Sequence, residues 1–380
     1  MESTIGGTRR HLVDVALGQA AAGLRVHVAA SCERHDEFRG DMTRMAGAGV
    51  DVHEIPMVRS ISPGVDWTHL RRIRHLLREL RPDVVHTHSS KAGVLGRMAS
   101  SSTGIGARVH TPHTFAFLFG HMFGPAKRRF FRSVEKHLAR STHRFVAVGP
   151  GEAETMAASG VVDPARVRVV PNGIDPTPFA SAEPFPRTEF RRGEDELLAA
   201  VVGLLNVAKG QDLAIRALAH EACATVRLLL VGHGEWEGEL RALAHDLGVA
   251  QRVEFLGWRR DVPRILRSID ALLLPSRWEG MPYVVLEAMA AGTPVLAARV
   301  DGARDLLHDG RGGFTFEVGS VDGLADVVER LGRATPEDRR RLGGAGRAEI
   351  ERSHTVATMV AGLLEVYREA MVEAAGGARR

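Results

Sequence analysis

Two carboxylates in the stretch WEGMPYVVLE (278–287), Glu279 and Glu287, are spaced so that they could serve one ligand. The apolar run DALLLPS (270–276) before them predicts a buried strand, and Pro282 suits the first turn of a following helix. In open α/β sheets, ligands bind at the carboxyl ends of strands, and the N–H groups that begin a helix attract phosphate or sugar oxygens. We therefore expect Glu279 in a loop at a pocket mouth and Glu287 in the helix. The spacing fits a surface acid and an unrelated helix acid equally well.

The strong preference of this chain for arginine over lysine indicates one candidate cation. Of the 50 basic residues only four are lysines, namely Lys91, Lys127, Lys136 and Lys209. A lysine that persists in such a chain favours a place where a compact, flexible ammonium is needed, although chance retention explains any single one about as well. Lys209, which stands beside a glycine, is the candidate.

The rest of the chain alternates short apolar runs with stretches of helical periodicity, a pattern typical of parallel sheets covered by helices on both faces. The predicted strands lie at 24–30, 50–56, 83–88, 107–113 and 144–149, and then at 197–205, 225–234, 252–258, 270–276 and 294–298. A Pro-rich segment around 171–196 separates the two series and predicts an interdomain linker. We expect an α/β chain of two Rossmann-like, doubly wound domains, the first spanning residues 1–175 and the second residues 176–354.

The first domain opens on a Gly-rich loop, IGGT, that leads directly into a helix. A doubly wound domain normally begins with a strand that feeds such a loop, and this strand lies near the middle of the sheet. We expect the first sheet to lack its central first strand, and we favour a recorded start that lies downstream of the real one.

Composition excludes several classes of protein. Hydrophobic residues make up 44% of the chain and charged residues 25%, as in ordinary globular proteins. The two cysteines, Cys32 and Cys223, provide no disulfide framework and favour a reducing cytosol. No apolar stretch approaches the ~18–20 residues of a membrane span, and the N-terminus lacks the apolar core of a signal peptide. The expected location is cytoplasmic.

One segment, residues 127–144, carries the positive charge of the chain. Its two Lys, five Arg and one Glu sum to +6, whereas the whole chain is only +4. Phe130 and Phe131 are interleaved with these charges, so the segment could lie on an anionic membrane. A solvated helix with its Phe residues in the core is an equally good interpretation. Nucleic acid is not expected as a partner, because no stacking platform or recognition motif accompanies the charge.

Four histidines, His86, His88, His110 and His113, fall at the ends of adjacent predicted strands. Zinc is possible in principle, but no cysteine or carboxylate stands beside them, so hydrogen bonding in the core or near an acceptor is the favoured role. The chain also lacks the Asp-x-Asp pair that would hold Mg²⁺ on a diphosphate. We expect no metal and a diphosphate held by lysine and helix dipoles.

The motif E-G-M-P-x-x-x-x-E, preceded by PSRW and followed by AMAAGTPVLA, resembles the signature of retaining GT-B glycosyltransferases of family 4. Further stretches resemble that family in the family's order: GGTRRH (6–11), HTHSSKAG (86–93), HTPHTF (110–115), VVPNGID (169–175), VGLLNVAKGQD (202–212), LLLVGHG (228–234) and FLGWRRDVP (255–263). The resemblance implies two domains facing a central cleft. The first would bind the acceptor, the second would bind the donor nucleotide sugar, and a last helix at about 355–374 would cross back to the first domain.

The resemblance also implies roles for individual residues. Glu287 matches the position that binds the nucleotide ribose, Glu279 the position that contacts the donor sugar, and Lys209 the cation that neutralises the diphosphate. The implied catalytic residues are His113, Glu279 and Lys209. The implied donor-binding residues are Gly7, Asn206, Lys209, Glu279, Gly280, Met281, Pro282 and Glu287. His88 and Lys91 are weaker candidates on the acceptor side.

The chain departs from the family at Leu204, where an Arg usually precedes the Lys by five residues. One phosphate-neutralising charge is missing, and we expect Asn206, Arg259 or another group to compensate.

The reaction that the resemblance implies is transfer of a sugar, with retention, from a UDP- or GDP-type donor to an acceptor hydroxyl in cell-surface polysaccharide or glycolipid synthesis. No further cofactor is expected. The pairing of HTHSSKAG with HTPHTF is similar to members that build polysaccharides on lipid carriers, so a lipid-linked acceptor and a peripheral membrane position are expected. A nonhydrolysing sugar-nucleotide epimerase and an inactive nucleotide-sugar-binding protein remain alternatives.

Overall fold

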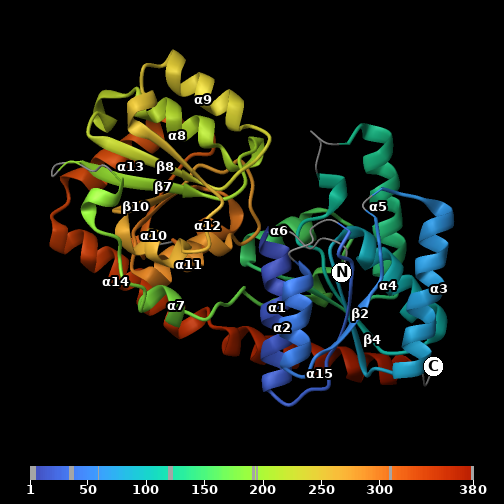
Figure 1. Ribbon diagram of the computed structural model, residues 1–380. Coiled ribbons are helices and arrows are strands. Elements are labelled where there is room, and N and C mark those ends of the chain that lie inside the picture. The colour runs from blue at the N-terminus through green and yellow to red at the C-terminus, as the bar shows by residue number, and fades with distance from the viewer. Residues whose placement is uncertain are drawn as a thin grey trace. The chain divides into compact units, whose positions relative to one another are not determined.

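The computed structural model describes residues 6–33, 38–58, 60–118, 123–190, 193, 196–307 and 310–377. The chain forms two compact units, Met1–Asn172 with Val356–Arg380, and Gly173–Thr355. Figure 1 shows the strands and covering helices of each unit. Among the described residues, no helix combines the length and apolarity that a bilayer span requires.

The first unit holds two parallel sheets. One pairs β1 (His27–Ala30) with β2 (Asp51–Glu54), and the other runs in the order β3 (Val84–His88), β4 (Ala107–Thr111), β5 (Arg144–Ala147), β6 (Val167–Val169). The helices of this unit are α1 (Gly6–Ala21), α2 (Phe38–Gly47), α3 (Pro63–Leu80), α4 (Ser90–Thr103), α5 (Pro125–Ala139), α6 (Pro150–Ala158) and α15 (Val356–Gly377). Among the described residues these are two separate sheets, and the expectation of a missing first strand concerns residues before Gly6, which lie outside the described residues.

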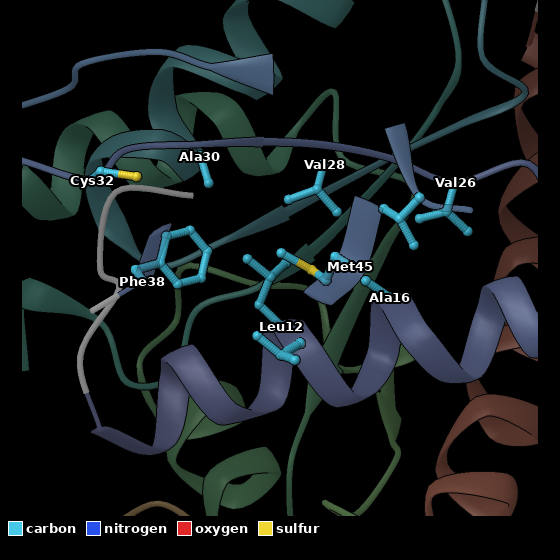
Figure 2. Packing of buried hydrophobic residues seen from close by; sticks show 10 residues of the cluster. Leu12, Ala16, Val26, Val28, Ala30, Cys32, Phe38 and Met45 are labelled. Carbon is cyan, nitrogen blue, oxygen red and sulfur yellow. The ribbon is translucent and has the colours of Figure 1, made fainter. Parts of the chain in front are cut away.

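Two apolar clusters hold the helices of the first unit in place. In one cluster, Leu12 and Ala16 of α1 pack against Val28 of β1, with Phe38 and Met45 of α2 beside them (Figure 2). The other cluster joins α15 to the sheet, because its buried face meets β4 and β5; its members include Val109, Val146, Leu363 and Val366. The last helix therefore packs on the first unit, although the residues before it belong to the second.

The second unit holds one six-stranded parallel sheet. Its strands lie in the order β12 (Gly313–Phe316), β11 (Val295–Ala298), β10 (Ala271–Leu274), β7 (Leu197–Val202), β8 (Val226–Val231), β9 (Val253–Gly257). Its helices are α7 (Thr177–Ala180), α8 (Gln211–Leu218), α9 (Glu237–Asp246), α10 (Val262–Ser268), α11 (Tyr283–Ala291), α12 (Asp301–Leu306), α13 (Val321–Arg333) and α14 (Pro336–Ser353). Every residue of β10 and β11 is buried, as parallel strands covered on both faces require.

Short 3₁₀ helices complete the chain: η1 (Ala116–Leu118), η2 (Pro164–Arg166), η3 (Arg187–Phe190), η4 (Val207–Lys209), η5 (Glu221–Cys223) and η6 (Ala250–Arg252). The two sets of parallel strands with intervening helices confirm the predicted α/β class and its two Rossmann-like units.

Candidate active site

The second unit brings two candidate loops together at the centre of its sheet. β7 is the first strand in sequence, β8 lies on one side of it, and β10 lies on the other. The connections that follow β7 and β10 therefore leave in opposite directions, and a ligand crevice forms outside the carboxyl ends of such a pair of strands. The loop after β7 carries Lys209, and the loop after β10 carries Glu279.

Arg277 fastens these two loops to each other. Its guanidinium binds both carboxylate oxygens of Asp212, at 2.9 and 2.7 Å, and donates to the carbonyl of Val207 at 2.7 Å. The hydrogen bonds that Arg277 donates to Asp212 raise the pKa of Arg277 above its ordinary value. Close approach also requires a glycine: a Cβ at Gly210 would lie 2.1 Å from the carbonyl oxygen of Pro275, and the backbone there has φ +67°. These contacts therefore hold the two loops firmly together beneath Lys209, the candidate cation.

Lys209 and Glu279 meet on this platform. The Lys209 Nζ lies 2.5 Å from Glu279 Oε1, and Ser276 Oγ donates to the same carboxylate oxygen at 3.0 Å. The two side chains are 24% and 15% exposed, so both reach solvent from a partly enclosed site. Asn206 sets the position of Lys209, because its side chain caps η4 and accepts the backbone N–H of Lys209 at 3.3 Å. The Lys209 ammonium and the Glu279 carboxylate thus lie together at the carboxyl ends of β7 and β10.

The helix that follows the Glu279 loop carries Glu287. α11 begins at Tyr283 after Pro282, and Glu287 lies one turn inside it, half-buried. Gly280 lies against α12: a Cβ on Gly302 would lie 2.0 Å from the Gly280 carbonyl oxygen. The structure therefore places the predicted donor residues 279–282 on a loop braced by a neighbouring helix, directly before α11.

The groups that were expected to compensate for Leu204 are both engaged locally. Leu204 itself is 37% exposed. Asn206 Oδ1 accepts the N–H groups of Ala208 and Lys209. Arg259 makes a bidentate pair with Asp261 at 2.8 and 2.7 Å, and this hydrogen bonding lowers the pKa of Asp261.

The first unit brings histidines together, and one of them, His11, was not among the predicted site residues. His88 Nδ1 lies 3.3 Å from His113 Nε2, and the ring of His11 in α1 lies 4.8 Å from the ring of His113. His11 Nδ1 pairs with Asn172 Oδ1 at 2.8 Å, and its Nε2 has no hydrogen-bond partner among the described residues. The stretch GGTRRH contained His11, but only the fold shows that α1 points it at the strand ends.

The other two predicted histidines have structural partners. His86 binds the hydroxyl of Tyr367 at 2.7 Å and that of Thr111 at 2.8 Å. The His110 ring is hydrogen-bonded to both the hydroxyl and the backbone carbonyl of Thr87. Burial lowers the pKa of His11 to about 4 and that of His86 to about 3. Burial also lowers the pKa values of His88, His110 and His113 well below the ordinary value, so these five rings are neutral at pH 7.

Three of these rings could bind a metal ion. The ligand atoms of His11, His88 and His113 all lie within 4.8 Å of one another. Neutral imidazoles are good ligands for Zn²⁺, whereas the Mg²⁺ that serves diphosphates prefers carboxylate and water oxygens. The cluster therefore does not provide a Mg²⁺ site for a nucleotide.

The backbone at His113 is strained and is held by a buried acid. His113 has φ +50° and Thr114 has φ +81°, a conformation that β-branched residues rarely adopt. Glu152, which is 5% exposed, accepts the N–H of Thr114 at 2.9 Å and the N–H of Val148 at 2.8 Å. Glu152 was not among the predicted site residues, although an acid near the start of a helix is a recognisable signal.

The remaining first-unit candidates lie apart from these contacts. Gly7 is exposed in the first turn of α1. Lys91 Nζ pairs with Asp66 Oδ1 and with the Ser60 carbonyl, both at 2.5 Å.

Residues 127–139 of the basic segment lie in α5, and the two aromatic residues of the segment differ in exposure. Phe130 is 56% exposed among basic residues, whereas Phe131 packs on the core. Arg97, which is wholly buried, pairs with Glu135 at 2.8 Å and ties the other face of α5 to α4. One face of α5 therefore belongs to the core, and the other presents charge with one exposed ring.

Two Rossmann-like units with this arrangement of strands define the GT-B class of glycosyltransferase. The solved structure of Anabaena HepE in complex with UDP and glucose matches 97% of this chain and 98% of its own, with a TM-score of 0.82 and 22% identity. That likeness shows the fold.

The family follows from the sequence comparisons. The model for Glycosyltransferase Family 4 matches residues 5–177, and the model for Glycosyl transferases group 1 matches residues 196–333. The Escherichia coli UDP-Gal:alpha-D-GlcNAc-diphosphoundecaprenol alpha-1,3-galactosyltransferase is 30% identical over 312 residues, 77% of each chain. The D-inositol 3-phosphate glycosyltransferase of Actinosynnema mirum is 31% identical over 80% of this chain and 84% of its own. The chain belongs to the group 1, family 4 glycosyltransferases, and it is a transferase enzyme.

Proposed function

We propose that this enzyme transfers a sugar, with its anomeric configuration retained, from a nucleoside diphosphate sugar to a hydroxyl of a lipid-linked acceptor. The second unit binds the donor, and the first binds the acceptor. The observation that carries the proposal is the Lys209–Glu279 pair at the carboxyl ends of β7 and β10, the position at which open α/β sheets bind nucleotides.

Each donor-side group has a defined task in this proposal. The Lys209 ammonium and the amide groups that begin α11 hold the diphosphate and stabilise its charge as it leaves. Glu287 accepts hydrogen bonds from the ribose hydroxyls, and Glu279 contacts the donor sugar.

The chemical step is a displacement on one face of the sugar. The bond from the anomeric carbon to the diphosphate oxygen breaks with its electron pair, a bond from the acceptor oxygen forms on the same face, and the acceptor proton passes to the departing phosphate. In this proposal Glu279, which contacts Lys209 and Ser276, orients the sugar and forms no covalent intermediate.

The reaction proceeds without Mg²⁺ in this proposal. Lys209 supplies the positive charge that a metal supplies elsewhere, and the described cluster suited to a metal consists of three imidazoles. Excess EDTA should leave the transfer rate within a factor of about two, since the charge of Lys209 and the α11 amides supplies the electrostatic stabilisation. An absolute requirement for added Mg²⁺ would contradict this part of the proposal.

A membrane-bound acceptor accounts for the exposed face of α5. The printed name of the E. coli relative includes a diphosphoundecaprenol substrate. Phe130 lies exposed on α5 beside Lys127 and Arg129, a combination suited to the surface of an anionic membrane. We place the enzyme in the cytoplasm, peripheral on the inner face of the plasma membrane, as part of cell-surface polysaccharide or glycolipid synthesis.

Labelled UDP- and GDP-sugars, offered with and without vesicles that contain an undecaprenyl-diphosphate sugar, test the proposal. Product that forms only with the lipid acceptor supports it, and we expect the UDP donors to react. Conversion of the donor alone would identify an epimerase, and binding without turnover would identify a binding protein.

Flotation with vesicles tests the membrane surface separately. The triple change Lys127→Gln, Arg129→Gln, Phe130→Ser should reduce binding to anionic vesicles, because it removes two charges and the exposed ring. The matched control changes Arg340 and Arg341, which are exposed on α14, to Gln. Equal losses in the two variants would rule out a specific role for α5.

A further inference from the structure

Three histidines of the first unit converge from three different elements. His11 lies in α1, His88 is the last residue of β3, and His113 follows β4. The centre of the His11 ring lies 5.3 Å from that of His88 and 4.8 Å from that of His113. One ligand atom from each ring lies within 4.8 Å of the other two. The neighbouring strands bring two imidazoles together, and α1 supplies the third.

His11 offers a buried nitrogen that the first unit leaves unused. The residue is 1% exposed, and its Nδ1–H donates to Asn172 Oδ1 at 2.8 Å. A neutral imidazole with its proton on Nδ1 has a lone pair on Nε2. This Nε2 has no hydrogen-bond partner among the described residues. A buried acceptor without a donor is costly, so the position favours an added group that binds the lone pair.

The hydrogen bond to Asn172 is of the kind that metal-binding histidines make. Such a histidine usually donates its other ring N–H to a carboxylate, a carbonyl or a water, and this contact fixes the nitrogen that faces the metal. The amide oxygen of Asn172 is the carbonyl in this case. His11 is therefore held in the tautomer that can bind an ion through Nε2.

The spacing of the other two rings fits a tetrahedral ion. His88 Nδ1 lies 3.3 Å from His113 Nε2. Two nitrogens that bind one Zn²⁺ at about 2.0–2.1 Å in tetrahedral geometry lie about 3.3–3.4 Å apart. The widest separation among the three ligand atoms exceeds this value by at most about 1.5 Å, which rotation of the rings can close.

The backbone that carries His113 is held in place by contacts of its own. It has φ +50° at His113, and the next N–H, that of Thr114, donates to Glu152 at 2.9 Å. β3 and β4 pair in register through His88 and Thr111, two residues before His113. Ligands positioned in advance lose less conformational freedom when an ion binds, and this favours affinity.

We propose that His11, His88 and His113 form a binding site for Zn²⁺, with three imidazole ligands and a fourth position for water. Imidazole nitrogens suit Zn²⁺, whereas Mg²⁺ and Ca²⁺ prefer oxygen ligands. His11 and His88 are buried and His113 is half-buried, so the ion enters and keeps its water on the side of His113. Three protein ligands and one open position are typical of sites at which a Zn²⁺ ligand exchanges.

Zn²⁺ at this site inhibits the transferase, a consequence that rests on the proposed function. His113 is among the residues expected to act in transfer, and its Nε2 cannot hold an ion and contact a substrate at once. Transfer should therefore slow as Zn²⁺ is added, and EDTA should restore it. Enzyme prepared without zinc needs no ion, in agreement with the expected insensitivity to EDTA.

Metal binding is measured on the full chain, without a histidine tag and without substrate. The parent protein should bind one Zn²⁺ in competition with a chromophoric chelator, and Co²⁺ in its place should show the intense visible absorption of a tetrahedral complex. His11→Gln should weaken Zn²⁺ binding roughly 100-fold or more. Asn172→Ala keeps all three imidazoles and loses the hydrogen bond to His11, so it should weaken binding about 10- to 100-fold.

His86→Gln is the matched control. His86 is a neighbour of His88, with ring centres 4.2 Å apart, and its two ring nitrogens bind Tyr367 and Thr111. This variant should keep the Zn²⁺ affinity of the parent. Circular dichroism without metal shows whether each variant folds, and if His11→Gln does not, Asn172→Ala provides the test. A parent protein that binds no Zn²⁺, or equal losses in His86→Gln and Asn172→Ala, would overturn the proposal.

Transfer is measured separately, so that failure of the zinc site and failure of the proposed function are distinguishable. In Asn172→Ala the Zn²⁺ concentration for half-maximal inhibition should rise by the same factor as the Kd for Zn²⁺. A protein that binds Zn²⁺ as expected but transfers no sugar would support the site and contradict the proposed function. Undiminished transfer by the Zn²⁺-bound enzyme would overturn the inhibition.

Discussion

Lys209 Nζ lies 2.5 Å from Glu279 Oε1, although the two residues are seventy positions apart and leave different strands. The ammonium that we assign to the donor diphosphate is thus neutralised by a carboxylate before any donor binds. A diphosphate that approaches Lys209 must compete with Glu279 or move it toward the sugar. Under our assignment, the pair would therefore couple nucleotide binding to the position of the Glu279 carboxylate.

Replacing Glu279 should separate nucleotide binding from transfer. In Glu279→Gln the competing charge is gone, so the Kd for UDP should fall about threefold to tenfold, while transfer should slow roughly 100-fold because the sugar loses a contact. Lys209→Ala should weaken UDP binding and slow transfer roughly 100- to 1,000-fold. Calorimetric titration with UDP and initial transfer rates give both quantities.

Glu317→Gln is the matched control, because Glu317 is an exposed acid paired with Arg299 in the same unit. It should change neither quantity. Weaker UDP binding in Glu279→Gln would show that the carboxylate itself holds the nucleotide, against our assignment.

The exposed Leu204 predicts a gain of affinity by substitution. Leu204→Arg adds a cation to the loop of Lys209, and it should lower the Kd for UDP roughly tenfold at low salt, with the gain shrinking as ionic strength rises. Leu204→Gln adds a polar chain without charge and serves as the control. If both variants bind UDP like the parent protein, position 204 does not face the diphosphate.

Glu152 should act on the reaction by holding the backbone at His113. Glu152→Ala leaves the N–H groups of Thr114 and Val148 without this acceptor, which should destabilise the first unit by about 2–4 kcal/mol. Transfer should fall while UDP affinity, which we assign to the second unit, stays unchanged. Chemical denaturation and titration with UDP measure the two effects.

Thr114→Gly tests the strain at the same place. Glycine tolerates φ +81°, so this variant should gain about 1 kcal/mol of stability if the left-handed backbone is present. A loss of stability would contradict the loop conformation.

The buried histidines predict a dependence of stability on pH. Burial lowers the pKa of His11 to about 4 and that of His86 to about 3, below the value of about 6.5 in an unfolded chain. Between pH 6.5 and pH 4 the unfolded chain therefore binds protons that the folded chain does not. The free energy of unfolding should be at its full value above pH 6.5 and should fall by about 1.4 kcal/mol per pH unit for each such histidine.

Thermal unfolding between pH 4.5 and pH 7.5 measures this slope. His86→Gln can keep hydrogen bonds to Tyr367 and Thr111. It should reduce the slope of unfolding free energy against pH by the contribution of one histidine. An unchanged slope in this variant would mean that His86 does not remain neutral in the folded chain.

Some of the candidate site could be predicted because its signals are local. Pro282 and the apolar run before Glu279 predict a strand, a loop and a helix in that order, and the structure has β10, a loop and α11 there. His11 could not be assigned in this way, because nothing in its neighbourhood along the chain relates it to His113. The role of Arg277 was missed for the same reason: its partner Asp212 lies far along the chain, in the first turn of α8.

The sequence by itself determined the class of fold, the succession of strands and helices, and the residue types available for a nucleotide sugar. These properties follow from periodicity and turn chemistry within short windows. Only the tertiary structure decided which distant side chains meet: Lys209 with Glu279, and His11 with His113. The order of strands in a sheet sets these meetings, and strand order depends on long-range pairing and burial that no short stretch of sequence contains.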